Sequence, residues 1–275
     1  MLLKYLRESF ARKKARRKFN EYAYKIDSFE LPEEGTVQFA NWQNPLIPPK
    51  KITQAEINFF KQFIPKGSLA IDIGTNIGDT TVPMAFAAGK EGLTLGFDPN
   101  PHVFKILEAN AGLNKDKTNI VVKPFAIADK EAEFFYTSSE ASYSNGGITE
   151  VSNNYHGKFV LPQKVRGIVL KDFLEKEFSE WLPKISFIKV DCEGLDKEII
   201  KSMADLLREY KPVVISECFT RLSKEERHDL YDSLARHGYE LYYFGDFVAG
   251  TPTQKLTPAD MTKWKMFNLY AIAKK

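Results

Sequence analysis

Cysteine is scarce in this chain of 275 residues, and long apolar runs are missing. The two cysteines, Cys192 and Cys218, form no Cys-x-x-Cys or Cys/His cluster, which argues against a disulfide framework and a zinc site. No run of 18 apolar residues could span a bilayer, and the basic N-terminus lacks the apolar stretch and cleavage site of a signal peptide. We therefore expect a cytoplasmic protein with small buried thiols rather than a redox pair.

The glycine motifs of the common nucleotide-binding proteins are also missing. The chain has neither the Gly-x-Gly-x-x-Gly of a pyrophosphate-binding loop nor the Gly-Lys-Ser/Thr of a nucleoside triphosphatase. Their absence argues against a nicotinamide-dependent dehydrogenase or epimerase. With 43% hydrophobic residues, the chain can nevertheless form one full-sized domain with an extension.

An apolar run does end in an acid and two spaced glycines. Residues 69–73, Leu-Ala-Ile-Asp-Ile, fit a parallel strand that is covered on both faces. Asp72 lies where this strand ends, Gly74 allows a sharp turn, and Gly78 allows a helix or a ligand to approach the backbone. This pattern predicts a buried strand that opens into a ligand site.

A second predicted strand, residues 93–97, also ends in an acid. It leads into Asp98-Pro99-Asn100-Pro101. An acid at the end of the second strand of a βαβ unit commonly binds ribose hydroxyls. The two strand ends together predict a nucleoside cofactor whose other end is a charged amino-acid tail.

Further apolar segments supply the rest of a doubly wound α/β sheet with helices on both faces. We predict strands at 119–128, 185–191 and 212–217, helices at 52–63, 103–113, 196–210 and 223–237, and a closing antiparallel hairpin from 239–244 and 266–273. The domain would span residues 51–275, with an insertion at 131–170 that carries strands near 134–136 and 165–170.

Four motifs of this domain point to a family. They are Asp72-Ile-Gly-Thr-Asn-Ile-Gly-Asp, Phe97-Asp98-Pro99-Asn100-Pro101, Asp172-Phe173-Leu174 and Phe187-Ile188-Lys189-Val190-Asp191-Cys192-Glu193-Gly194. Over about residues 64–244 the chain resembles the FkbM-type methyltransferases, which use S-adenosylmethionine and have a Rossmann-like fold. The resemblance implies a class I methyltransferase fold, a mostly parallel seven-stranded sheet with an antiparallel last strand. It also implies O-methylation, often of sugar hydroxyls on glycans or natural products. Asp98 stands where the family often has Glu, which preserves a ribose contact.

We place the amino-acid end of S-adenosylmethionine near the first strand, its ribose on Asp98, and its adenine against the third strand. The predicted cofactor-binding residues are Asp72, Gly74, Thr75, Asn76, Gly78, Asp98, Asn100, Phe125, Ala126 and Asp191.

Methyl transfer to an alcohol requires that the hydroxyl lose its proton. Asp191, at the end of the fourth strand, is our first candidate for contacting the acceptor, with Glu193, Lys189 and His156 as further catalytic candidates. Glu193 could instead cap the helix after Gly194, and a loop histidine is usually solvated. Asp191 and Glu217 end neighbouring strands, so they could hold Mg²⁺. The alternative is a buried ion pair between Glu217 and Lys189.

The acceptor is expected to be a sugar hydroxyl in a glycan or a lipid-linked glycan. Tyr143, Ser144 and Asn145 in the insertion could bind its hydroxyls, or their segment could be a plain connection. The alternatives are a small natural product and a nucleic acid reached through a basic arm. The Asp/Asn-Pro-Pro-Tyr/Phe tetrapeptide of nucleic-acid amino-methyltransferases is missing, and Asp191-Cys-Glu-Gly takes its place.

The first 20 residues form a strongly basic segment. They hold eight Lys and Arg against one Glu, a net charge of +7, whereas the rest of the chain is net negative. On a helix, Leu2, Leu3, Leu6 and Phe10 would form one apolar stripe, typical of a segment that lies on an anionic membrane surface. This would make the protein peripheral at the inner face of the membrane. A helix packed against its own domain or a second subunit, as in a homo-oligomer, is the alternative. Residues 41–49 suggest an irregular linker, so 1–50 would be helix and linker.

Overall fold

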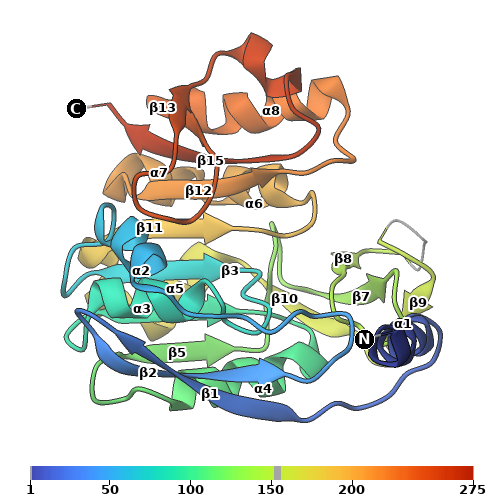
Figure 1. Ribbon diagram of the computed structural model, residues 1–275. Coiled ribbons are helices and arrows are strands. Elements are labelled where there is room, and N and C mark those ends of the chain that lie inside the picture. Colours follow the sequence, from blue (N-terminus) through green and yellow to red (C-terminus); the bar gives the residue numbers. More distant parts are fainter. Residues whose placement is uncertain (1, 152–155, 275) are drawn as a thin grey trace.

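The computed structural model describes residues 2–151 and 156–274. Within them, the largest sheet has eight strands in the order β14-β13-β15-β12-β11-β3-β4-β5 (Figure 1). The strands are β3 (Leu69–Ile73), β4 (Leu93–Phe97), β5 (Ile120–Lys123), β11 (Ile185–Val190), β12 (Val213–Cys218), β13 (Tyr239–Phe244), β14 (Thr253–Lys255) and β15 (Phe267–Ala273).

The strand directions confirm the predicted sheet. β5, β4, β3, β11 and β12 run parallel, and β15 lies antiparallel between β12 and β13. The short edge strand β14, inside the long loop of the closing hairpin, was not predicted.

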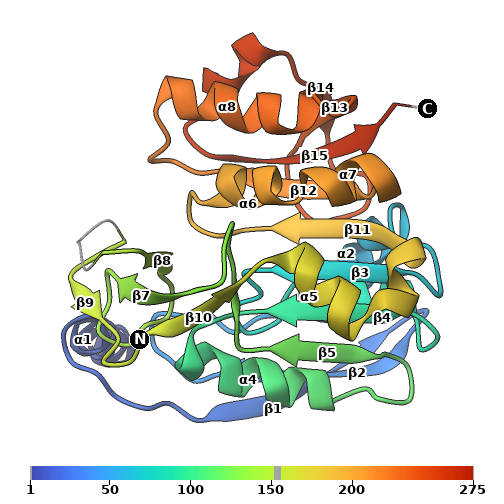
Figure 2. The same ribbon diagram turned by 180° about the vertical axis from the view of Figure 1, so that it is seen from behind.

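Helices cover both faces of this sheet, which explains why β3 and β4 are buried along their whole length. Side chains of α2 (Gln54–Lys61) and α3 (Thr81–Ala88) pack on one face around Phe187. Those of α5 (Leu170–Glu177), α6 (Asp196–Ser202), α7 (Ala204–Tyr210) and α8 (Lys224–Ala235) pack on the other (Figure 2). Two 3₁₀ helices, Ser179–Lys184 and Pro258–Thr262, complete this side.

Two predicted elements are interrupted. The strand predicted at 119–128 ends at Lys123, because Pro124 has no N–H for a ladder, and its last residues form β6 (Ala126–Ile127) in another sheet. The helix predicted at 196–210 is two helices, because Met203 leaves helical geometry with φ −94° and ψ 11°.

The insertion forms a small sheet of its own at the carboxyl ends of the parallel strands (Figure 1). Its order is β6-β10-β7-β8, with β9 also paired to β7. The elements are β7 (Ala132–Ser138), β8 (Gly147–Thr149), β9 (Phe159–Val160) and β10 (Val165–Ile168). The two strands predicted here are therefore confirmed, while β8 and β9 were not predicted.

A hairpin precedes the domain where the sequence suggested a linker. β1 (Tyr24–Leu31) and β2 (Gly35–Trp42) pair antiparallel, and the second strand packs against α4 (Pro101–Gly112). The Asn110 amide on α4 accepts the N–H of Ala40 at 2.6 Å and donates to its carbonyl at 3.1 Å. The linker prediction is therefore wrong for residues 24–42, whose buried side chains belong to the core of the domain.

Helix α1 (Leu2–Arg17) lies beside the small sheet, at the same edge of the molecule (Figures 1 and 2). Within residues 2–151 and 156–274, none of the helices combines the length and the hydrophobicity that a membrane span requires.

Candidate active site

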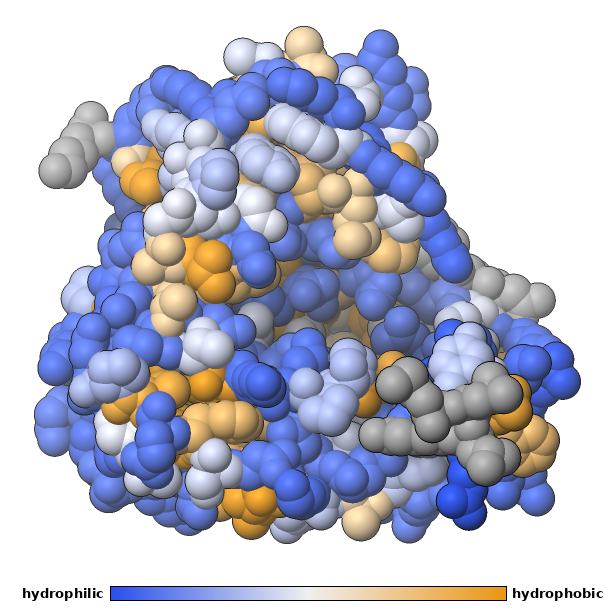
Figure 3. Space-filling model, viewed as in Figure 1, coloured by the Kyte–Doolittle hydropathy of each residue, from blue (hydrophilic) through white to orange (hydrophobic). Residues whose placement is uncertain are grey.

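The carboxyl ends of β3, β4 and β11 face the small sheet across a cavity. Figure 3 shows the molecular surface hollowed in this region. Seven of the residues predicted to bind the cofactor or to act in catalysis line the cavity: Gly74, Asn76, Asp98, Phe125, Ala126, Asp191 and Glu193. Ligands of open α/β sheets bind at this edge, so the cavity is the candidate active site.

Gly74 lets the ends of β3 and β11 come together. Its φ is +78°, and a Cβ at this position would lie 2.0 Å from the carbonyl oxygen of Asp191. Any other residue would push the two strand ends apart. Gly74 therefore allows the ends of β3 and β11 to lie side by side, so that Gly74 and Asp191 both line the cavity.

Asp98 is held at the end of β4 by two backbone donors. Its Oδ2 accepts the N–H of Asn76 and its Oδ1 accepts the N–H of Asn100, both at 2.9 Å. Burial raises the pKa of this carboxyl to about 7. Each oxygen has a second acceptor site, and the carboxyl lines the cavity, which matches the two hydroxyl donors of a ribose.

The cavity wall beyond Asp98 is apolar. It includes Phe97, Val103, Phe125 and Ile148. The Phe125 ring packs edge-on to Phe173, with 6.0 Å between centroids, and fixes the shape of the slot. An apolar slot next to a carboxyl that could accept ribose hydroxyls fits an adenine ring.

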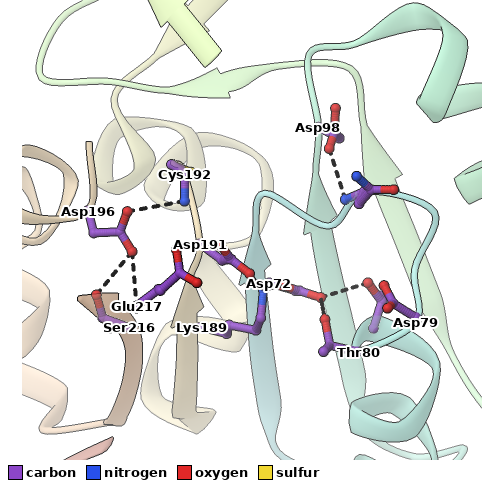
Figure 4. Close-up of polar contacts among 12 residues, drawn as sticks. Asp72, Asp79, Thr80, Asp98, Lys189, Asp191, Cys192, Asp196, Ser216 and Glu217 are labelled. Atoms are coloured by element: carbon purple, nitrogen blue, oxygen red, sulfur yellow. Dashed lines mark hydrogen bonds and ion pairs between the residues drawn. The ribbon is translucent and has the colours of Figure 1, made fainter. Parts of the chain in front are cut away.

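Lys189 forms a buried ionic link beneath the cavity (Figure 4). Its Nζ lies 3.3 Å from both Asp72 Oδ1 and Asp191 Oδ2. Burial alone would lower the pKa of Lys189, but the Asp72 and Asp191 carboxylates outweigh it and raise this pKa. Lys189 thus stays charged and holds the Asp191 side chain, which is 44% exposed, at the cavity.

Asp72 lies below the cavity and does not line it. The side chain is fully buried, and its Oδ2 accepts the hydroxyls of Thr80 at 2.9 Å and Thr81 at 2.7 Å. The structure thus places Asp72 next to Lys189 rather than in contact with the space that the cofactor would fill.

Three other residues predicted to bind the cofactor also lie outside the cavity lining. Thr75 is buried and its methyl packs towards Gly96. Gly78 faces Leu107 of α4. Asn100 caps α4 and donates to the Tyr143 carbonyl at 2.6 Å, which links the main domain to the insertion.

Several carboxyls gather at the carboxyl ends of β11 and β12. Burial, and then the charge of Asp191, raise the pKa of Glu193 to about 7 and that of Glu217 to about 8. Glu193 has a left-handed φ of 54° and lines the cavity, whereas Glu217 does not.

Asp196 is a site residue that the sequence analysis missed. Its fully buried carboxyl accepts the N–H of Cys192 at 3.2 Å, the hydroxyl of Ser216 at 3.0 Å and the N–H of Glu217 at 3.3 Å (Figure 4). Burial raises its pKa to about 7. Asp196 thus links the segment after β11 to the end of β12. In the sequence, the signal for this role is that Asp196 lies four residues after Cys192.

The predicted metal pair gains no further ligands. In residues 2–151 and 156–274, no group of three or more His, Cys, Asp or Glu side chains is arranged to hold a metal ion. The predicted alternative, an ion pair between Glu217 and Lys189, is not formed either, because Lys189 pairs with Asp72 and Asp191. Cys192 and Cys218 are free thiols; Cys218 is buried as predicted, whereas Cys192 is half-buried.

His156 lies in a smaller pocket next to the cavity. This pocket shares Glu193, Asn145 and Gly146 with the cavity, and Arg221 also lines it. Burial, and then the charge of Arg221, lower the pKa of His156 to about 4. The imidazole is therefore neutral at pH 7 and a weak base.

The insertion contributes its own residues to the cavity. Asn145, one of the three candidates for binding the acceptor, lines it, whereas Tyr143 donates its hydroxyl to the Val160 carbonyl at 2.8 Å, and the Ser144 hydroxyl bonds to Glu140. The buried Tyr136 of β7 also lines the cavity. The segment at 142–147 is thus part of the site wall.

The sheet order, its reversed last strand and the strand-end cavity define the fold of the class I S-adenosylmethionine-dependent methyltransferases. The profile of the Methyltransferase FkbM domain matches residues 72–241, more than half of the chain. The protein belongs to this methyltransferase family, whose methyl donor is S-adenosylmethionine.

Solved structures of other methyltransferases are similar at low identity. A precorrin-6y C5,15-methyltransferase from Geobacter metallireducens GS-15 has 12% identity and a TM-score of 0.43, covering 86% of this chain and 93% of its own. The methyltransferase FkbM from Methylobacillus flagellatus KT has 14% identity and a TM-score of 0.45, and the match covers 78% of this chain and 50% of that one. An S-adenosylmethionine-dependent O-methyltransferase from Thermotoga maritima has 11% identity and a TM-score of 0.41, and the match covers 91% of this chain and 78% of that one. No curated protein matches the sequence.

Proposed function

We propose that the protein is an O-methyltransferase that methylates a sugar hydroxyl of a glycan or glycolipid. The observation that carries this proposal is the pair Asp191 and Glu193, which line the same cavity as Asp98. An alcohol acceptor needs a base, and two carboxyls at the cavity can orient the hydroxyl and take its proton.

The cavity residues fit the cofactor. Asp98 would hold the ribose, the slot at Phe125 and Ala126 the adenine, and the Gly74 to Asn76 turn the amino-acid end. When bound there, S-adenosylmethionine supplies an electrophilic methyl group on a sulfonium.

The chain's own residues would then align and deprotonate the acceptor. Asp191, fixed by Lys189 at 3.3 Å, accepts a hydrogen bond from the hydroxyl and orients it. Glu193 takes the proton, because a carboxyl with a pKa of about 7 is a stronger base than an ordinary one and is still ionised near neutral pH.

This proposal does not use Mg²⁺, because Glu193 can take the proton without a metal ion. We expect full activity in the presence of EDTA. Activity that is lost in EDTA and restored by Mg²⁺ would instead favour the metal-assisted mechanism.

The pH dependence of turnover tests the role of Glu193. The base must be ionised, so protonation below its pKa of about 7 should lower the rate as the pH falls from 8 to 6. We expect Glu193→Gln to be slower and to lose this limb of the pH profile. A variant that keeps the parental rate and profile would exclude Glu193 as the base.

The acceptor class can be tested with deuteromethyl-labelled S-adenosylmethionine. The full-length enzyme is incubated with separate glycolipid, polysaccharide, small-metabolite and nucleic-acid fractions, and the products are hydrolysed and analysed by mass spectrometry. We expect the label in a sugar methyl ether. Label in a nucleobase or only in a small non-sugar metabolite would contradict the proposal.

A further inference from the structure

Helix α1 is attached to the domain by one narrow face. Ala15 is fully buried, and the Arg16 carbonyl accepts the N–H of Ala141 at 3.2 Å. Arg16 Nε also lies 3.9 Å from a carboxylate oxygen of Glu140. These contacts all come from the C-terminal half of the helix and join it to the insertion.

The opposite face of α1 carries exposed apolar and basic side chains. Leu6, Phe10, Lys13 and Arg17 are spaced four, three and four residues apart, so they share one side of the helix. Leu6 is 52% and Phe10 72% exposed. The apolar stripe predicted from the sequence therefore does not pack on its own domain at these two positions; the side chains of Leu2 and Leu3 lie outside the described set.

The basic charges of this helix are mostly unneutralised. From Tyr5 to Lys18 the chain has seven Lys and Arg against Glu8 alone. In the part of the chain that the structure describes, Arg16 is the one member of this group within ion-pair distance of a carboxylate. Exposed apolar side chains on a helix with dense positive charge match the chemistry of a bilayer surface with anionic headgroups.

Helix α1 also lies next to the cavity. Glu140 and Ala141, its contacts in the insertion, come just before Asn145, which lines the cavity. After α1 the Phe19 ring packs on His102, with 4.8 Å between centroids. A surface that binds α1 therefore lies beside the insertion, whose segment at 142–147 forms part of the cavity wall (Figures 1 and 2).

We propose that α1 binds an anionic lipid bilayer and thereby holds the cavity at the membrane surface, where the sugar acceptor is carried on a lipid. The first half of this proposal concerns binding alone. The second half rests on the proposed O-methyltransferase function.

Co-sedimentation with vesicles tests the binding. Full-length protein should sediment with mixed phosphatidylglycerol and phosphatidylcholine vesicles, be released by salt, and ignore pure phosphatidylcholine. We expect Lys13→Glu/Arg17→Glu to weaken binding about tenfold or more, and Leu6→Ser/Phe10→Ser to weaken it as well. The matched control is Lys66→Glu/Lys115→Glu, an equal charge change in loops that precede β3 and β5 at the far edge of the sheet.

Three results would overturn the proposal. The first is that the protein does not bind the anionic vesicles, and the second is that the control pair weakens vesicle binding as much as the α1 pair does. The third is that the α1 variants dissociate an oligomer or release nucleic acid while their vesicle binding is unchanged. S-adenosylmethionine affinity and methylation of a water-soluble glycan should be the same in the α1 variants as in the parent. If the parent itself neither binds S-adenosylmethionine nor methylates the glycan, the O-methyltransferase proposal is refuted. Vesicle binding is still decided by its own assay.

Discussion

Asp191→Asn is expected to lower kcat by about 10²- to 10⁴-fold while the affinity for S-adenosylmethionine changes by only a few fold. Asn has the same shape as Asp but presents one weaker acceptor and an N–H₂ group, so it cannot orient the acceptor hydroxyl with a carboxylate. It also removes one of the two carboxylates that neutralise Lys189. Single-turnover kinetics and calorimetry with the cofactor would separate the two effects.

Glu217→Gln is the matched control for this substitution. Glu217 also lies at the carboxyl end of a central strand, β12, but does not line the cavity, so its variant should keep most of the activity. If Asp191→Asn bound the cofactor poorly, or if both variants lost activity equally, the assignment of Asp191 to the acceptor would be wrong.

Asp98→Ala should weaken S-adenosylmethionine binding by at least tenfold. Each hydrogen bond from a ribose hydroxyl to the Asp98 carboxylate is worth about 1.5 to 3 kcal/mol, and every 1.4 kcal/mol is a factor of ten in affinity. Calorimetry on the purified protein measures the loss directly.

The same variant also removes the acceptor for the N–H groups of Asn76 and Asn100, so its thermal unfolding must be recorded alongside. Asp116→Ala, in the loop before β5, removes an exposed acid far from the cavity and should leave affinity unchanged. Parental affinity in folded Asp98→Ala would show that the ribose lies elsewhere.

The parts of the fold that could be predicted are those that neighbouring residues in the sequence reveal by themselves. β3 and β4 are covered on both faces, so they are continuous apolar runs that end visibly at Gly74 and Asp98. Because the carboxyl ends of parallel strands share one edge, Asp98 and Asp191 could be placed at one cavity from their positions alone.

The rest depends on contacts between distant segments. Nothing near Asp72 in the sequence shows that Lys189 will neutralise it, which turns an expected ligand contact into a buried ion pair. The β1–β2 hairpin also depends on distant contacts, because β1 is largely exposed and β2 is fixed by the Asn110 amide from a helix 70 residues away.

A crystal structure of the protein with S-adenosylhomocysteine would test the central claim most directly. The account predicts the ribose hydroxyls within hydrogen-bond distance of Asp98, the adenine against Phe125, and the sulfur facing Asp191 across the cavity. A cofactor bound outside this cavity, or bound inside it with the sulfur turned away from Asp191, would contradict the account.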